Sequence, residues 1–394
     1  MKVYLDNSAT TALDKEVLNA MLPYFTDTFG NPSSLHGYGR KALKAVDEAR
    51  ETIAKVIGAK SNEIYFTSGG SESDNWALKG VVGATKAKRK HIITSQIEHP
   101  AIMDTLEYLK SKEGVEVTYL PVDKDGRVSV ADLKEAVTDD TILVSVMFAN
   151  NEMGAVQPIA EIGAFCKEEG ILFHTDAVQA MDSQDIDVNA LNIDLLSMSA
   201  HKFHGPKGIG ALYIRSGVKL DRLISGGHQE RRMRAGTTDT PLIVGMAKAL
   251  EIAVRDREEN NKRISELRNN FIKKVLDEIP FTYLNGGMEH RLPNNANISF
   301  EYVEGESILI TLDLQGIAVS SGSACSSGSL EPSHVILALG VKEELAHSSI
   351  RFSLGKDTTQ EEMDYTFDVL KASVERLRSM SPLFNMEKGI GYYV

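Results

Sequence analysis

From about residue 60 to residue 215, short apolar runs alternate with segments of helical periodicity. One helical segment has Pro158 at its start and Gly170 just past its end, as α-helices prefer. The apolar runs expected to form strands are 63–67, 91–95, 115–121, 141–149, 171–175, 195–199 and 210–214. Strands that alternate with helices favour a mostly parallel sheet with helices on both faces, so we predict an α/β fold.

The character of the chain changes after this region. From Pro241 to about Ile279 a helical pattern carries many charges and few turn signals, which indicates a helix or helix pair leaving the sheet. The remainder reads as α+β, with strands expected near 297–302 and 349–354 and helices near 306–314 and 359–379. A length of 394 residues fits two or three domains, and a boundary is expected near residue 260.

Composition excludes several classes of protein. Lys and Arg number 43 against 55 Asp and Glu, which gives a net charge of −12. A chain this acidic lacks the excess positive charge that general binders of nucleic acid or anionic membranes carry. The longest apolar stretch, 141–149, is far shorter than the roughly 20 residues of a bilayer span. The sequence starts with no secretory signal, and two cysteines cannot build a disulfide framework. We expect a cytoplasmic protein without membrane or direct nucleic-acid partners.

The two cysteines occupy different settings. Residues 320–329 contain only Ser, Gly and Ala around Cys325, and nothing in this segment can anchor a core. It therefore predicts a mobile loop that carries a thiol. Cys166 lies beside Phe165 in the helical segment 158–170 and is expected to be a buried structural thiol.

Lys202 directly follows an apolar run and has His201 as its neighbour. A lysine held at a strand end and partly desolvated suits a Schiff-base amine. Taken alone, it also fits a solvated surface lysine. His201 and His204 lack a carboxylate or cysteine at the spacing of an HExxH site, so no metal site is expected there.

Other polar residues also follow expected strands. Asp176 ends an apolar run, where an open α/β sheet binds ligands, and it could hold a proton on a pyridine nitrogen or cap a helix. His99 could stack on a planar ring and move protons, or be an ordinary buried histidine. The turn 67–73, with Gly69 and Gly70, offers backbone N–H groups to a phosphate at a helix start, although such turns also contain glycine for steric reasons. It is not a Walker A loop.

Several motifs occur together in one order: Tyr4–Thr11 (YLDNSATT), Asn150–Gly154 (NNEMG), His174–Gln179 (HTDAVQ), Ser199–Lys202 (SAHK), Arg234–Thr237 (RAGT) and Ser321–Cys325 (SGSAC). Together they closely resemble the cysteine desulfurases of the NifS/IscS-like branch, pyridoxal-phosphate enzymes of the fold-type I aminotransferase class. The resemblance covers residues 3 to about 378. It implies a large domain (15–260) with a mostly parallel seven-stranded sheet between helices. A smaller α+β domain (1–14 and 261–394) would carry the cysteine loop.

The resemblance implies removal of sulfur from L-cysteine, which leaves L-alanine and a persulfide on Cys325. The catalytic residues would be Cys325, Lys202, which holds pyridoxal 5′-phosphate covalently and takes the Cα proton, and His99. Asp176 would pair with the ring nitrogen and Gln179 with the ring O3′. The implied cofactor-binding set is Gly70, Ser71, His99, Asn151, Asp176, Gln179, Ser199, His201, Lys202 and, from a second subunit, Thr240. The substrate carboxylate would meet Arg351, Asn31 and Asn151.

The same resemblance implies a homodimer, because Thr240 would reach a partner's site. The sulfur would pass to an acceptor protein, such as an iron–sulfur scaffold, for cluster assembly or other thiolation. No intrinsic metal is expected, and Cys325 is a candidate transient ligand of a shared iron–sulfur cluster. The tail after Ser381 does not match the tail with which housekeeping members dock a scaffold, so the acceptor stays open.

Two alternatives compete with this interpretation. Another pyridoxal-phosphate reaction, such as transamination or selenocysteine β-elimination, fits the same fold, but a transaminase has no use for the thiol of Cys325. An assembly platform that has lost its activity is the other alternative. The presence of Lys202, Asp176, His99 and Cys325 argues against it.

Overall fold

The computed structural model describes residues 1–321, 331–381, 384–385 and 390–391. Its larger part is a seven-stranded sheet with the order β2-β8-β7-β6-β5-β3-β4. Only β8 runs antiparallel to its neighbours β2 and β7. The mostly parallel sheet predicted from the sequence is therefore confirmed. The strands are β2 (Ile64–Thr67), β3 (His91–Ser95), β4 (Glu116–Leu120), β5 (Thr141–Ser145), β6 (Leu172–Asp176), β7 (Leu195–Ser199) and β8 (Gly210–Ile214).

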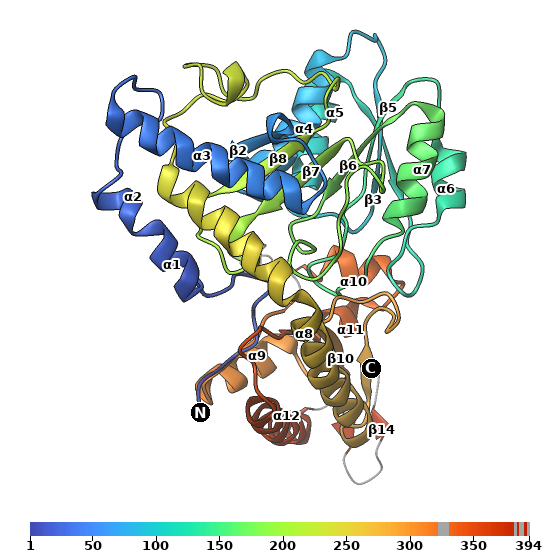
Figure 1. Ribbon diagram of the computed structural model, residues 1–394. Helices are drawn as coiled ribbons and strands as arrows, with labels where there is room; N and C mark the ends of the chain where they lie inside the picture. The colour runs from blue at the N-terminus through green and yellow to red at the C-terminus, as the bar shows by residue number, and fades with distance from the viewer. Residues whose placement is uncertain (322–330, 382–383, 386–389, 392–394) are drawn as a thin grey trace.

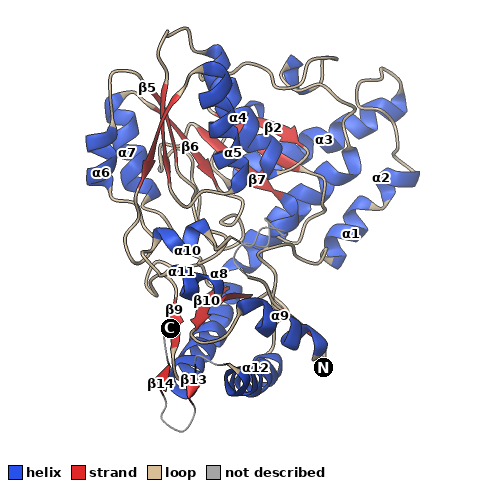
Figure 2. Ribbon diagram, turned by 180° about the vertical axis from the view of Figure 1, so that it is seen from behind, coloured by secondary structure: helices blue, strands red, loops and turns tan. Residues whose placement is uncertain are grey.

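Helices cover both faces of this sheet (Figure 1, Figure 2). Successive residues of a strand point to opposite faces, so each strand contributes side chains to both layers. In β7, Leu196 packs in one apolar core and its neighbour Leu195 in another. The Leu196 core receives side chains from α1 (Lys15–Met21), α3 (Gly37–Val56), α6 (Val130–Ala136), α7 (Ile159–Glu169) and α8 (Thr240–Glu278). The Leu195 core is closed by α4 (Gly70–Ala84) and α5 (Pro100–Glu113). Cys166 is 1% exposed within α7, as expected of a structural thiol.

The smaller part has its own sheet and core. A three-stranded antiparallel sheet has the order β12-β10-β9, and the short β1 pairs with β11 in parallel. The strands are β1 (Val3–Tyr4), β9 (Thr282–Leu284), β10 (Asn295–Phe300), β11 (Ile317–Ala318), β12 (Ser349–Ser353), β13 (Phe384–Asn385) and β14 (Ile390–Gly391). The helices are α9 (Gly305–Leu314), α10 (His334–Ala338), α11 (Glu343–His347) and α12 (Gln360–Met380), and α2 (Pro23–Thr26) follows α1 in the larger part.

The 39-residue helix α8 connects the two parts (Figure 1). Its first half, including Ile243 and Ile252, packs in the core of the large sheet. Its second half, including Ile264 and Val275, packs in the second core, which also holds Val3 and Leu5. We therefore propose the division at about residue 260, with residues 1–14 in the smaller domain. Within the described ranges, no helix is long and apolar enough to cross a membrane.

Candidate active site

The carboxyl ends of the parallel strands border a cavity of about 370 Å³. Asp176 ends β6, Ser199 ends β7, and His99 follows β3 by a few residues. This is where open α/β sheets bind their ligands. Most of the predicted cofactor and substrate residues line the cavity: Gly70, Ser71, His99, Asn151, Asp176, Gln179, Ser199, His201, Lys202 and Arg351.

Lys202 lies at the end of a single 3₁₀ turn, Ala200–Lys202, that directly follows β7. Its Nζ donates hydrogen bonds to the carbonyl oxygens of Ser8, at 2.5 Å, and Ala9, at 2.9 Å. The preceding His201 contacts the same segment, because its Nδ1 lies 3.1 Å from Thr10 Oγ1. Burial lowers the pKa of His201 to about 4, so the imidazole is neutral at neutral pH. The N-terminal segment thus forms part of the wall around the amine.

Asp176 is buried at the bottom of the same cavity. Its Oδ1 accepts a hydrogen bond from the Val178 N–H at 2.9 Å in a turn. No helix of the described residues begins there, so the alternative of a helix cap is wrong. Burial raises the pKa of Asp176, and it raises that of the neighbouring Asp74 well above the usual range. A cationic group bound in the cavity would therefore be attracted to Asp176, since it would offset the cost of burying the carboxylate.

His174 lies on β6, two residues before Asp176, and its Nε2 is 3.8 Å from Asp74 Oδ1. Its Nδ1 is 2.8 Å from Ser145 Oγ and its Nε2 is 3.1 Å from Ser197 Oγ. Burial lowers its pKa to about 3, so the ring is neutral. This histidine is bonded through both ring nitrogens and adds no charge to the buried region beside Asp74.

His99 is the N-cap of α5. Its Nδ1 accepts a hydrogen bond from the Ala101 N–H at 3.1 Å, which leaves the proton of the neutral ring on Nε2. Burial lowers the pKa of His99, while the nearby Asp176 opposes this shift. His99 therefore presents a neutral imidazole with a fixed tautomer to the cavity.

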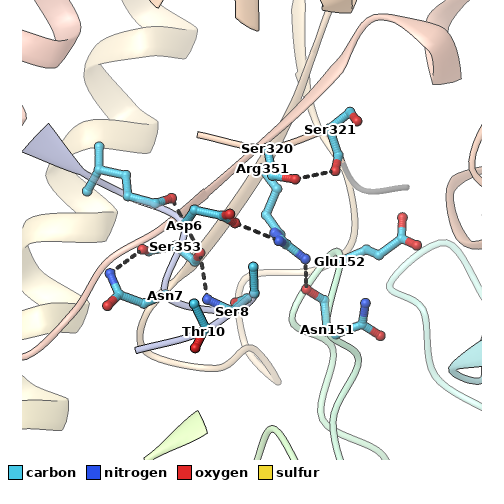
Figure 3. A network of polar contacts seen from close by, with 12 residues as sticks. Asp6, Asn7, Ser8, Thr10, Asn151, Glu152, Ser320, Ser321, Arg351 and Ser353 are labelled. Carbon is cyan, nitrogen blue, oxygen red and sulfur yellow. Dashed lines mark hydrogen bonds and ion pairs between the residues drawn. The ribbon is translucent and has the colours of Figure 1, made fainter. Parts of the chain in front are cut away.

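Arg351 extends from β12 of the smaller domain into the cavity (Figure 3). Its Nη2 donates to Asp6 Oδ1 at 2.8 Å, and its Nη1 donates to the Asn151 carbonyl oxygen at 2.9 Å. Its Nε is buried and has no hydrogen-bond partner among the described residues. A buried N–H without a partner is costly, so this atom is suited to an acceptor on a ligand, such as a carboxylate.

Comparison with known proteins identifies the family to which this cavity belongs. The family described as Aminotransferase class-V matches residues 3–366. The chain belongs to the class-V aminotransferases. It is 57% identical over 385 residues to the cysteine desulfurase IscS of Clostridium botulinum, covering 97% of each chain. It is 56% identical to the cysteine desulfurase IscS of Methanosarcina thermophila, covering 97% of this chain and 94% of that one.

Solved structures agree with these relatives. A NifS-like protein superposes with a TM-score of 0.90 at 40% identity, over 96% of this chain and all of that one. A structure described as SspA in complex with cysteine superposes with a TM-score of 0.80 at 39% identity, covering 91% and 100%. The predicted membership of the NifS/IscS-like branch and the predicted fold-type I architecture are both confirmed.

Class-V aminotransferases of this branch depend on pyridoxal phosphate, and the cavity fits that group. Helix α4 begins at Gly70 without a side-chain cap, so its first backbone N–H groups are available to a phosphate. A Cβ on Gly70 would lie 2.8 Å from Val178 Cγ2, so only glycine allows this close approach. The buried Oγ of Ser8 also lacks a partner among the described residues. The phosphate would meet the N-terminus of α4, the ring nitrogen would meet Asp176, and the substrate carboxylate would meet Arg351.

Not every predicted residue is brought to the cavity. Asn31 is exposed, and its Oδ1 accepts a hydrogen bond from the Ser33 N–H at 2.9 Å. Thr240 lies in the first turn of α8, is 3% exposed and does not line the cavity of its own chain, and its reach to a partner's site stays a prediction. Thr237, on the segment before α8, is exposed. Cys325 lies outside the described residues.

Sequence reasoning missed the contribution of the N-terminal segment. Asp6 and the Ser8 and Ala9 carbonyls contact Arg351 and Lys202, yet the motif 4–11 was the only signal for them. It also missed Asp74, which shares the buried face of α4 with Leu78 at a spacing of four residues. A carboxylate on the apolar side of a helix was the available signal for Asp74.

Proposed function

We propose that this chain is a cysteine desulfurase that removes sulfur from L-cysteine, releases L-alanine and passes the sulfur through Cys325 to an acceptor protein. The observation that carries the proposal is the joint placement of Lys202, Asp176 and Arg351 in one cavity. The chain supplies there an amine, a buried carboxylate and a carboxylate-binding guanidinium, and it is 57% identical to a cysteine desulfurase IscS.

The cofactor-binding side of the site is built from the large domain. Pyridoxal phosphate supplies an electron-withdrawing ring that makes the Cα proton of a bound amino acid acidic. Lys202 Nζ is the amine that would hold the cofactor, and once freed it would be placed to accept the Cα proton of a bound amino acid. Asp176 would hold a proton at the ring nitrogen, and the N-terminus of α4 would bind the phosphate. His99, neutral and with its proton on Nε2, would donate a hydrogen bond on the substrate side, and it would have to gain a proton first in order to deliver one there.

The substrate-binding side comes from the smaller domain and the N-terminal segment. Arg351 binds the substrate carboxylate through Nε and the adjoining Nη groups, and Asp6 and the Asn151 carbonyl hold its orientation. Because two of its nitrogens are already fixed by protein acceptors, little side-chain entropy remains to be lost when substrate binds.

In the sulfur step, the thiolate of Cys325 attacks the sulfur of bound cysteine. An S–S bond forms, and the Cβ–S bond of the substrate breaks. Its electron pair stays on Cβ, which takes up a proton and becomes the methyl group of alanine. Cys325 is left as a persulfide, so the reaction needs no external oxidant.

The test is to incubate the protein with L-cysteine and a thiol reductant, beside Cys325→Ala and the matched control Cys166→Ala. Wild type and Cys166→Ala should yield equal amounts of alanine and sulfide. Cys325→Ala should yield neither while it retains cofactor. If Cys325→Ala formed alanine and sulfide at the wild-type rate, sulfur would not pass through Cys325 and the proposal would fail. Sulfide formed with pyruvate and ammonia in place of alanine would indicate β-elimination.

We propose further that the enzyme is a cytoplasmic homodimer that serves iron–sulfur cluster assembly or another thiolation. Sulfur transfer through a free thiol requires a reducing compartment. Large apolar side chains on α1, α2 and the start of α3 are exposed, and an apolar surface of this kind supports a second copy as partner. They are Leu18, Leu22, Phe25, Phe29, Leu35, Tyr38 and Leu43. Sedimentation as a monomer with full cofactor content would contradict the dimer.

A further inference from the structure

The chain that follows the cysteine-bearing segment is fixed to the wall of the cavity. It is described again from Glu331, and Ser333 caps the short helix α10. Ser333 Oγ donates a hydrogen bond to Glu152 Oε2 at 2.5 Å and accepts from the N–H groups of Val335 and Ile336. The next side chain, His334, donates from Nε2 to the Glu98 carbonyl oxygen at 3.1 Å.

Both acceptors adjoin residues of the site. Glu98 directly precedes His99, and Glu152 directly follows Asn151, whose carbonyl oxygen binds Arg351. Each of the two acceptor residues, Glu98 and Glu152, is therefore the direct neighbour in sequence of a residue that lines the cavity.

Glu152 and Glu98 are each held through their other polar group as well. The Glu152 carbonyl oxygen accepts hydrogen bonds from the Nδ2 atoms of Asn295 and Asn297, at 3.0 and 3.1 Å. The Glu98 carboxyl accepts from Ser95 Oγ and the Met147 N–H. Next to them, the buried Val335 packs in a small apolar cluster with Ile97, Met147, Met153 and Ala155.

The chain that precedes the cysteine-bearing segment is held as well. Ser320 forms an antiparallel bridge with Arg351, with backbone N–H to carbonyl distances of 3.2 and 2.6 Å. The segment that carries Cys325 therefore leaves the described structure at the substrate-binding arginine and returns to it beside His99.

We propose that Glu152, Ser333 and His334 form an anchor that positions the cysteine-bearing segment for sulfur transfer to Cys325. The inference rests on the proposed function, since it assigns positioning residues to that reaction. None of the three side chains lines the cavity, although Glu152 lies close enough to Arg351, and His334 to His99, for their charges to interact. Removing the hydrogen bond of Ser333 or of His334 leaves Glu152, Arg351 and His99 in place. Such a loss therefore lowers the effective concentration of the thiol at the substrate sulfur, and we expect substrate binding to stay unchanged.

The test separates sulfur transfer from substrate binding. In single turnover without added thiol, alanine formation reports attack by Cys325, and a cysteine titration followed by cofactor absorbance reports binding. Ser333→Ala and His334→Phe should each slow alanine formation about tenfold, the typical effect of losing one hydrogen bond to a charged or buried acceptor. The absorbance titration and the cofactor content should match wild type. Ser333→Thr and His334→Gln, which keep a donor, should recover most of the rate.

Two results would overturn the anchor. One is a wild-type rate of alanine formation in both Ser333→Ala and His334→Phe. The other is an equal loss in the titration and in alanine formation, which would indicate general structural damage. Cys325→Ala, measured in parallel, distinguishes this failure from failure of the proposed function. If that variant formed alanine at the wild-type rate, the proposed transfer of sulfur to Cys325 would itself be contradicted.

Discussion

Asp6 Oδ1 and Arg351 Nη2 form an ion pair at 2.8 Å, although 345 positions of the chain separate them. The side chain of Arg351 is 3% exposed and that of Asp6 is 22% exposed, so the pair is largely shielded from water. Asp6 is thus the residue that fixes the guanidinium before substrate arrives.

Replacing Asp6 by Ala should raise KM for cysteine about tenfold, because Arg351 would lose a charge-assisted hydrogen bond and its fixed orientation. Asp6→Asn keeps an acceptor oxygen and should recover most of the affinity. Steady-state kinetics with alanine as the product measure both. Equal KM values for wild type and Asp6→Ala would show that the Asn151 carbonyl alone holds Arg351.

The buried Glu98 should make the free energy of unfolding depend on pH in the neutral range. Burial raises its pKa from 4.5 to about 8, and its Oε2 has no hydrogen-bond partner among the described residues. Between these two pH values the unfolded chain has lost the Glu98 proton while the folded chain keeps it. The contribution of Glu98 to stability is therefore complete below pH 4.5 and is lost as the pH rises through 8.

Glu98→Gln imitates the protonated carboxyl and keeps the acceptor for Ser95 and Met147. We expect wild type and Glu98→Gln to melt together at about pH 4.5, and the variant to melt at a progressively higher temperature as the pH approaches 8. Thermal unfolding across this range measures the difference. A difference that stays constant with pH would mean that Glu98 is already ionised in the folded chain.

Gly70 at the start of α4 offers a test of the phosphate site. A methyl group there would lie 2.8 Å from Val178 Cγ2, so Gly70→Ala should displace the Val178 wall and weaken retention of pyridoxal phosphate about tenfold or more. Gly37 is the matched control, because a Cβ there meets only Arg40 Nη2 at 3.9 Å. Dialysis followed by cofactor absorbance compares them. Equal retention by Gly70→Ala and Gly37→Ala would place the phosphate elsewhere.

Thr240 and Thr237 are the two candidates for the residue that a second subunit would contribute to the phosphate site. Thr240 is buried in its own chain, whereas Thr237 is exposed on the preceding segment. We expect Thr237→Val to weaken cofactor retention severalfold in the dimer, and Thr240→Val to lower the melting temperature without this loss. Weaker retention in Thr240→Val alone would instead restore the role predicted for Thr240 from the sequence.

Local patterns predicted local structure well. The strands 91–95, 195–199 and 210–214 have the expected bounds, and the helix expected near 359–379 is present as α12, with a capping box of Thr359 and Glu362 at its start. The run 141–149 was too long as a strand, since β5 ends at Ser145. Residues 146–149 stay buried after leaving the strand, and an apolar pattern alone cannot show where a buried strand ends.

Distant contacts were harder to predict. The bonds from Lys202 to Ser8 and Ala9 join residues more than 190 positions apart, and those acceptors are backbone carbonyls, which no side-chain pattern reveals. Asn31 does not line the cavity and its side chain is bonded in a turn with Ser33, so its contact with the substrate carboxylate stays a prediction. Residue type predicted the chemistry of the cavity, whereas the packing of the N-terminal segment decided which groups surround the amine.

The helix α8 passes through both domains without a break from Thr240 to Glu278. At 1.5 Å per residue a helix of this length extends about 58 Å, so it acts as a lever between the two cores. A bend of about one degree at its middle displaces either end by about 0.5 Å, which is a noticeable fraction of a hydrogen-bond length. Mutations at the far end of α8, remote from Lys202 and Arg351, should therefore change the distance between the amine and the guanidinium.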